Sequence, residues 1–220
     1  MYAVGKEPRL SMSPSQGSAK SPAADTPSAY SKYLALPTPA ETVRGLFMNG
    51  LLHMVKNHGG ELALKQCYEL LGDKRFERSF ISFSSYPMAD FLRVLVAASQ
   101  VMAPQFGSPD STARQLGATT VKDFLDSMAG KTLLLLSGGS PERLLSNVPA
   151  AYRAASNFGE RSVTMKGDKA ALVTFLHDFL PLPHTEGVLM AVLQASNARN
   201  PQIRSRSLGP LDSEYELSWD

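Results

Sequence analysis

Four histidines and one cysteine are the residues of this sequence best suited to metal binding or nucleophilic chemistry. No two of the histidines His53, His58, His177 and His184 have the spacing of zinc ligands with a carboxylate partner. The single cysteine excludes an intrachain disulfide and a multi-thiolate zinc site. Cys67 falls in an apolar helical stripe, where a buried and inert thiol is expected. We therefore predict packing or surface positions for all five residues, with His184 in a proline-rich loop.

A short motif resembles the end of a phosphate-binding loop. It reads Ala129-Gly130-Lys131-Thr132, but the glycine that should precede it is replaced by Leu125. Such a loop must also follow a strand and open a helix, whereas a predicted helix precedes this segment of the chain. We therefore reject nucleotide binding here. No Gly-x-Ser-x-Gly elbow, carboxylate pair or metal cluster stands out, so we predict that the chain is not an enzyme, although catalytic groups can converge from distant positions.

Composition places the chain among globular proteins. Its 220 residues are 43% hydrophobic and 19% charged, which is enough to bury a core in one domain. The 22 basic and 20 acidic side chains nearly cancel, which argues against nucleic-acid binding. A weak basic cluster at Arg199, Arg204 and Arg206 is predicted to be a solvated loop. No apolar run reaches bilayer length and no apolar signal core opens the chain, so we predict a cytoplasmic protein with no membrane partner.

The first 40 residues differ from the rest, because serine, proline and alanine fill 20 of these positions. Too little large apolar surface is present there to offset the entropy of ordering. We predict a disordered tail over 1–40 and a single domain over 41–220.

The remaining residues predict an α+β fold. Apolar spacing of three and four residues favours helices, and alternation favours strands. Gly59-Gly60 should separate the first two helices, Ser140 should cap a later one, and Pro149 should bend or divide it. Helices are predicted at 42–58, 61–71, 88–102, 109–127, 140–158 and 189–195, and strands at 161–166, 170–177 and 215–219. The helical N-terminal half should pack on a C-terminal antiparallel sheet.

The order of these elements resembles that of heme-nitric oxide/oxygen-binding (H-NOX) domains. The matching residues are Val43-x-Gly45-x-Phe47, Leu51-Leu52, His58-Gly59, Cys67 to Gly72, Phe83-x-x-Tyr86-Pro87, Ala97-Ala98-Ser99, Ser140-Pro141-Glu142-x-Leu144-Leu145-x-Asn147-Val148 and Gly187-Val188-Leu189. The chain is more similar to a myxobacterial family of uncharacterised proteins of about this length. That resemblance rests on Tyr86-Pro87, Leu116-Gly117, Phe124-Leu125, Phe158-Gly159 and Tyr215-x-Leu217-x-Trp219.

The resemblance also implies how heme would be held, and the residues here depart from it. Tyr152 stands where the H-NOX family places its iron-binding histidine. Thr174, Leu176 and Asp178 stand where the family places the Tyr-x-Ser-x-Arg triplet that binds the propionates, and Asp178 would repel a propionate. We therefore predict no heme and no other cofactor. A heme-based gas sensor that uses Tyr152 remains an alternative, since tyrosine can ligate ferric heme.

The resemblance further implies a pocket between the two halves of the fold. Its predicted lining residues are Phe47, Leu51, Phe91, Leu95, Leu144, Leu145 and Tyr152. We predict a non-enzymatic signalling or sensory module that binds a small apolar ligand or a protein partner. In the alternative, these side chains fill a core and the chain is a protein–protein interaction or homodimerisation module. Apolar residues on most faces of the 91–102 helix favour that alternative.

Overall fold

The computed structural model describes residues 30–220. Its N-terminal part consists of η1 (Ser31–Ala35), β1 (Thr42–Arg44), α1 (Gly45–Leu71), η2 (Lys74–Glu77), β2 (Ser85–Pro87), α2 (Met88–Phe106) and α3 (Pro109–Asp126). Its C-terminal part consists of α4 (Met128–Ser137), α5 (Pro141–Ser146), α6 (Val148–Ala155), β3 (Glu160–Met165), β4 (Ala170–Leu176), α7 (Leu182–Gln194), β5 (Gln202–Ser207) and β6 (Ser213–Ser218).

The main sheet is antiparallel and has the strand order β3-β4-β6-β5. Val173 pairs with Tyr215 and Ala171 pairs with Leu217, so the buried side chains of β4 and β6 share one face. That face is covered by helices, while the neighbouring pair Leu172 and Glu216 belongs to the more open face. A sheet covered on one side produces this alternation. The predicted α+β class, with helices packed on an antiparallel sheet, is confirmed.

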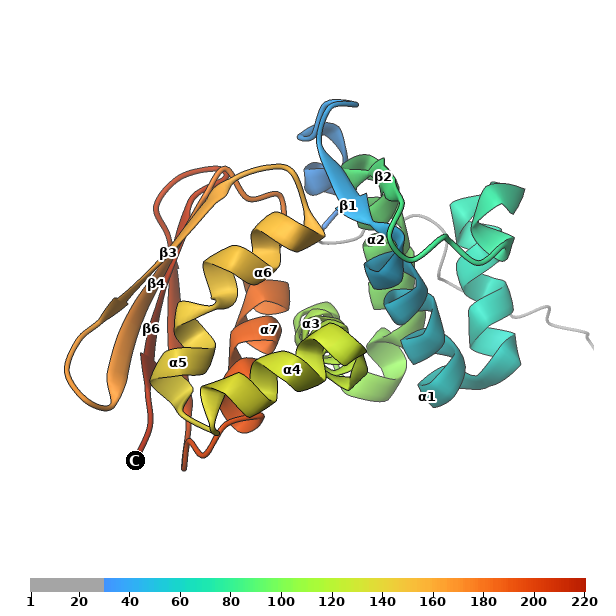
Figure 1. Cartoon of the computed structure of the whole chain (residues 1–220). Coiled ribbons are helices and arrows are strands. Elements are labelled where there is room, and N and C mark those ends of the chain that lie inside the picture. The colour runs from blue at the N-terminus through green and yellow to red at the C-terminus, as the bar shows by residue number, and fades with distance from the viewer. Residues whose placement is uncertain (1–29) are drawn as a thin grey trace, which may run out of the picture.

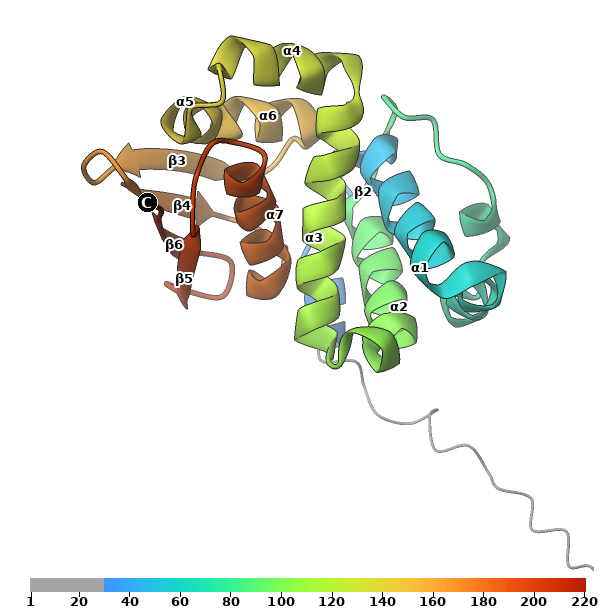
Figure 2. The ribbon, with the colours of Figure 1, turned by 90° about the horizontal axis from the view of Figure 1, so that it is seen from below.

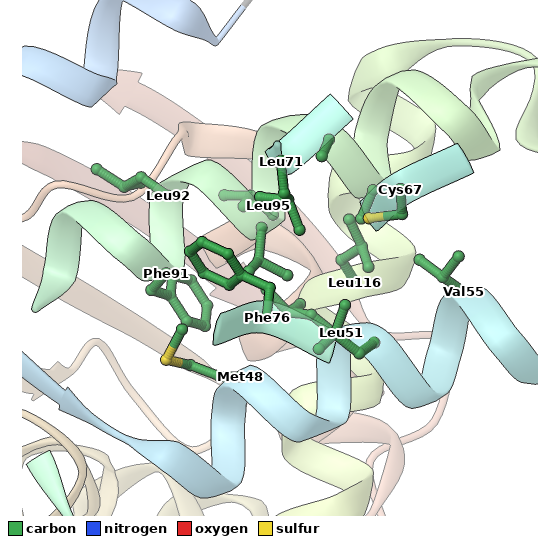
Figure 3. Packing of buried hydrophobic residues seen from close by; sticks show 14 of the residues in the cluster. Met48, Leu51, Val55, Cys67, Leu71, Phe76, Phe91, Leu92, Leu95 and Leu116 are labelled. Atoms are coloured by element: carbon green, nitrogen blue, oxygen red, sulfur yellow. The ribbon is translucent and has the colours of Figure 1, made fainter. Parts of the chain in front are cut away.

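Helix α3 stands between the two halves of the molecule. Figure 1 shows the sheet and α5–α7 on one side of α3 and the α1–α2 pair on the other, and the same division is seen from below in Figure 2. Buried residues form two corresponding cores. The first joins α1, α2 and η2 (Figure 3), and the second joins the sheet, α5 and α7. The apolar faces of α2 are thereby accounted for by packing against α1 and α3 within the chain.

Local signals in the sequence locate several helix boundaries. The predicted break near Gly60 is a kink inside α1, where this glycine has φ 73°, a value that glycine tolerates best. The Ser140 hydroxyl accepts a hydrogen bond from the Arg143 backbone N–H at 3.2 Å and so caps α5. The predicted division of the following helix is also found, because α5 ends at Ser146 and α6 begins at Val148.

Other elements differ from the prediction. Thr42–Arg44 forms strand β1 rather than the start of a helix, because it pairs with β2. The predicted loop with Arg204 and Arg206 is strand β5, whose polar alternation is typical of an edge. Backbone pairing with β6 forms this strand, and the Arg206 side chain also pairs with Glu214. The α4 helix, which contains the rejected phosphate-loop motif, was not predicted.

The predicted tail lies mostly outside the described residues, since 1–29 are not described. Within residues 30–40, the first part packs on the helices and residues 38–40 are exposed. Tyr30 is buried and donates a hydrogen bond from its hydroxyl to the Asp110 carboxylate at 2.5 Å. Tyr33 and Leu34 pack against the first core. Tyr30, at the N-cap of η1, and Tyr33 and Leu34 within it give this part of the segment apolar surface to bury.

Candidate functional site

A cavity of about 110 Å³ lies between the two cores. Val43, Phe47, Met88 and Phe91 form its wall on the side of the first core. The opposite wall comes from α3, α5, α6 and α7, and its residues include Val121, Phe124, Leu144, Val148, Ala151, Tyr152, His184, Val188 and Val192. The described lining contains no aspartate, glutamate, lysine or arginine. The cavity is therefore suited to a small, uncharged and mainly apolar molecule.

The structure separates the predicted pocket residues into two groups. Phe47, Phe91, Leu144 and Tyr152 line the cavity. The other three are packed inside the cores instead: Leu51 and Leu95 in the first core (Figure 3) and Leu145 in the second. Each helix has several apolar positions, and only those that face the junction of the two cores can contact a ligand. The binding role of all seven residues remains a prediction.

Tyr152 lies against a buried ion pair. Its ring packs edge-on against Phe175 with centroids 5.2 Å apart, and the Arg161 guanidinium lies 4.7 Å from its centroid. Arg161 donates to Asp178 at 3.0 Å, and their side chains are only 3% and 2% exposed. Burial, reinforced by the Asp178 carboxylate, raises the pKa of the Tyr152 phenol far above its ordinary value. This tyrosine is consequently held as a neutral phenol at physiological pH.

His184 is a site residue that the sequence did not reveal. It lies in the first turn of α7, not in a loop, and only 1% of it is exposed. Pro181 caps this helix and Pro183 occupies its first turn, where a missing N–H costs nothing. The predicted helix start at 189 was therefore too late. A buried histidine among prolines gave no periodic signal that could have placed it at the cavity.

The remaining candidate side chains lie away from the cavity. His53, His58 and His177 are exposed, and Cys67 is buried in the first core. Burial raises the pKa of the Cys67 thiol to about 12, which keeps this sulfur protonated. Within residues 30–220, no group of three or more metal-ligating side chains of the types His, Cys, Asp and Glu is found. None of the described helices is long and apolar enough to cross a membrane.

The family model described as "Protein of unknown function (DUF2378)" matches residues 37–220. The chain belongs to the DUF2378 family. This agrees with the predicted uncharacterised family, while the myxobacterial origin remains a prediction. No match is found among curated proteins.

Solved structures similar to this DUF2378 protein are H-NOX domains. The Fe(II) unliganded H-NOX protein from K. algicida has a TM-score of 0.64 at 14% identity, covering 80% of this chain and 96% of its own. The Fe(II)NO form of an H-NOX protein from S. oneidensis has a TM-score of 0.63 at 13% identity, covering 80% and 99%. The IWP-051-bound H-NOX from Shewanella woodyi has a TM-score of 0.58 at 14% identity, covering 80% and 94%. At these identities the likeness shows the fold, which confirms the predicted H-NOX resemblance.

The residues present do not fit a heme. The cavity of about 110 Å³ is smaller than the roughly 150 Å³ cavity that takes up one benzene. No lysine or arginine of the described lining is free to pair with propionates, and the neighbouring Arg161 is already bound to Asp178. The raised pKa of Tyr152 opposes the phenolate form that would ligate ferric iron. These three features separate the site from a porphyrin pocket in volume, charge and ligand chemistry.

Proposed function

We propose that this DUF2378 protein is a heme-free, non-enzymatic sensory domain of the cytoplasm that binds a small, mainly apolar ligand between its two cores. The observation that carries the proposal is the apolar cavity, whose walls come from both cores at once. The H-NOX-like fold supports a sensory role by analogy of architecture alone.

The position of the cavity gives ligand binding a physical route to a signal. A molecule in it touches α1 and α2 on one side and α6 and α7 on the other. Its affinity consequently depends on how closely the two cores approach. A ligand that prefers one spacing of the cores shifts the population toward that spacing, by no more than its difference in affinity.

Filling the cavity tests this proposal. Ala151→Phe adds a ring from a lining position of α6, and we expect toluene binding to the full chain to weaken by at least about ten-fold. Ala154→Phe is the matched control, because Ala154 is exposed on the same helix and does not line the cavity. Isothermal titration calorimetry measures both. If the wild-type protein takes up no toluene, this function is excluded. A stoichiometric Soret band on titration of the wild-type protein with hemin would overturn the heme-free part of the proposal.

A protein-binding role is the second candidate, and the outer side of α4 favours it. Met128, Leu135 and Leu136 are 84%, 82% and 75% exposed there, which is unusual for large apolar side chains grouped on one helix. If α4 mediates homodimerisation, light scattering at high concentration should give a dimer, and Leu135→Lys should return it to a monomer. A wild-type protein that stays monomeric would exclude the homodimer.

A further inference from the structure

The turn at residues 81–84, between η2 and β2, exposes two large apolar side chains. Ile81 is 69% exposed and Phe83 is 81% exposed. The Ser84 backbone N–H donates to the Ile81 carbonyl at 3.0 Å, which closes the turn. Figure 2 shows the segment between η2 and β2 as an outer loop beside α1. Both side chains therefore lie at the surface rather than in a core.

Backbone hydrogen bonds hold this turn against the start of α1. The Leu46 N–H donates to the Ser82 carbonyl at 2.9 Å, and the Gly45 N–H donates to the Ser84 carbonyl at 3.0 Å. A Cβ built on Gly45 would lie 2.5 Å from the Ile81 carbonyl oxygen, so this close approach requires a glycine. The first turn of α1 therefore fixes the backbone of the exposed turn.

Side chains hold the start of the turn as well. The Asn49 amide donates to the Phe80 carbonyl at 2.8 Å and accepts from the Phe80 N–H at 2.9 Å. The Tyr86 hydroxyl accepts from the Ile81 N–H at 2.9 Å. The turn is thus ordered before it meets a binding surface, which lowers the entropy lost on binding.

The charges around the turn are mainly basic. Residues 74–84 contain three basic side chains and one acidic side chain. One of the basic side chains, Arg78, is exposed. The Arg44 guanidinium donates to the Phe83 carbonyl at 2.8 Å and so lies directly beside the turn. Within the described part of the chain, neither of these two arginines forms an ion pair. Their charge complements an anionic surface.

The small size of this surface favours a membrane over a protein partner. Two side chains offer far less than the roughly 800 Å² that each partner buries in a stable protein interface. On a membrane, apolar side chains enter the boundary between headgroups and acyl chains, and basic residues are attracted to anionic headgroups. A few such groups are enough for weak and reversible binding, and no membrane-spanning helix is needed.

We infer that the turn at residues 81–84 binds an anionic membrane surface, with Ile81 and Phe83 in the interfacial layer and Arg44 and Arg78 beside the lipid headgroups. The inference goes beyond the proposed function and does not depend on the cavity. It departs from the sequence-based expectation of no membrane partner, which rested on the absence of an apolar run of bilayer length. Reversible binding of this kind would bring a sensory domain to the membrane without anchoring it there.

Co-sedimentation of the full chain with vesicles tests the inference. The vesicles contain phosphatidylcholine alone or an equimolar mixture of phosphatidylcholine and phosphatidylglycerol. We expect binding to the anionic mixture, and we expect Ile81→Ser/Phe83→Ser to weaken it by at least about ten-fold, because both inserted side chains are lost. Leu62→Ser is the matched control, since Leu62 is 70% exposed on α1 outside the turn. Its binding should stay within about two-fold of the wild type.

The same assay measures the contribution of the arginines. Arg78→Gln should weaken binding to the anionic vesicles by about five-fold, and added salt should reduce the difference, because salt screens the attraction to the headgroups. Arg204→Gln is the matched control and should change binding by less than about two-fold. Arg204 is exposed on β5 and also forms no ion pair within residues 30–220.

Three results would overturn the inference. The first is no binding to the anionic vesicles, or binding that Ile81→Ser/Phe83→Ser leaves unchanged. The second is equal binding to vesicles with and without phosphatidylglycerol. The third is a dimer in light scattering that Phe83→Ser dissociates, which would assign the turn to a second copy of the chain. Toluene uptake is measured separately, so each of these results leaves the proposed function standing.

Discussion

Asp178→Ala is expected to lower the free energy of unfolding by about 3–5 kcal/mol at neutral pH. The change leaves the Arg161 guanidinium buried, at 3% side-chain exposure, without its counter-charge. Three aromatic rings surround this guanidinium at 4.7 to 5.5 Å, from Tyr152, Phe158 and Phe175. Their faces attract a cation but do not replace the desolvated carboxylate. Urea denaturation followed by circular dichroism measures the loss.

The reciprocal and double variants show whether the loss arises from an uncompensated charge. Arg161→Met should be destabilising in the same way, because burial already raises the pKa of Asp178 and its carboxylate would lose the guanidinium that opposes this shift. The double variant Arg161→Met/Asp178→Leu should recover most of the stability, since an apolar pair can replace a buried ion pair. Glu61→Ala, which breaks an exposed pair with Lys56, should leave the free energy of unfolding nearly unchanged, because water and salt screen this pair. An equally small loss of stability in Asp178→Ala would show that Arg161 is not left as an uncompensated buried charge.

Acidification is expected to destabilise the wild type more than His184→Leu, by about 2–3 kcal/mol between pH 7.5 and pH 4.5. Burial lowers the pKa of His184 from 6.5 to about 4. The unfolded chain therefore binds a proton near pH 6.5, while the folded protein resists protonation until about pH 4. The stabilising contribution is fully present above pH 6.5 and is lost as the pH falls toward 4.

The difference in unfolding free energy between the wild type and His184→Leu isolates the contribution of His184 to the pH dependence of stability. The described lining contains no acidic or basic side chain besides this histidine, and Tyr152, its other titratable group, is neutral throughout the range. Burial also raises the pKa of Asp178, which gives an opposite slope at acidic pH, but this slope is common to both proteins and cancels. Urea midpoints at several pH values measure the effect. Parallel pH profiles would show that His184 is hydrated or bonded in solution.

The positions of most helices and of three strands of the main sheet could be predicted from the sequence, because their signals are local. The Ser140 cap, the kink at Gly60 and the division near Pro149 each depend on a few neighbouring residues. Strand β5 has one apolar residue, Ile203, and it depends on a partner strand for its formation. Its hydrogen bonds are not encoded in its own pattern.

Locating the candidate site required the tertiary structure far more than locating the helices and strands did. The sequence placed Phe47, Phe91, Leu144 and Tyr152 in a pocket through resemblance, and the structure brings these four to one cavity. The sequence could not distinguish these four residues from Leu51, Leu95 and Leu145, which are also apolar but are packed in the cores. Nor could the sequence show that His184 is buried with no hydrogen-bond partner among residues 30–220. Periodicity and capping are properties of neighbouring residues, whereas burial and an unmet hydrogen bond depend on which distant segments converge around a side chain.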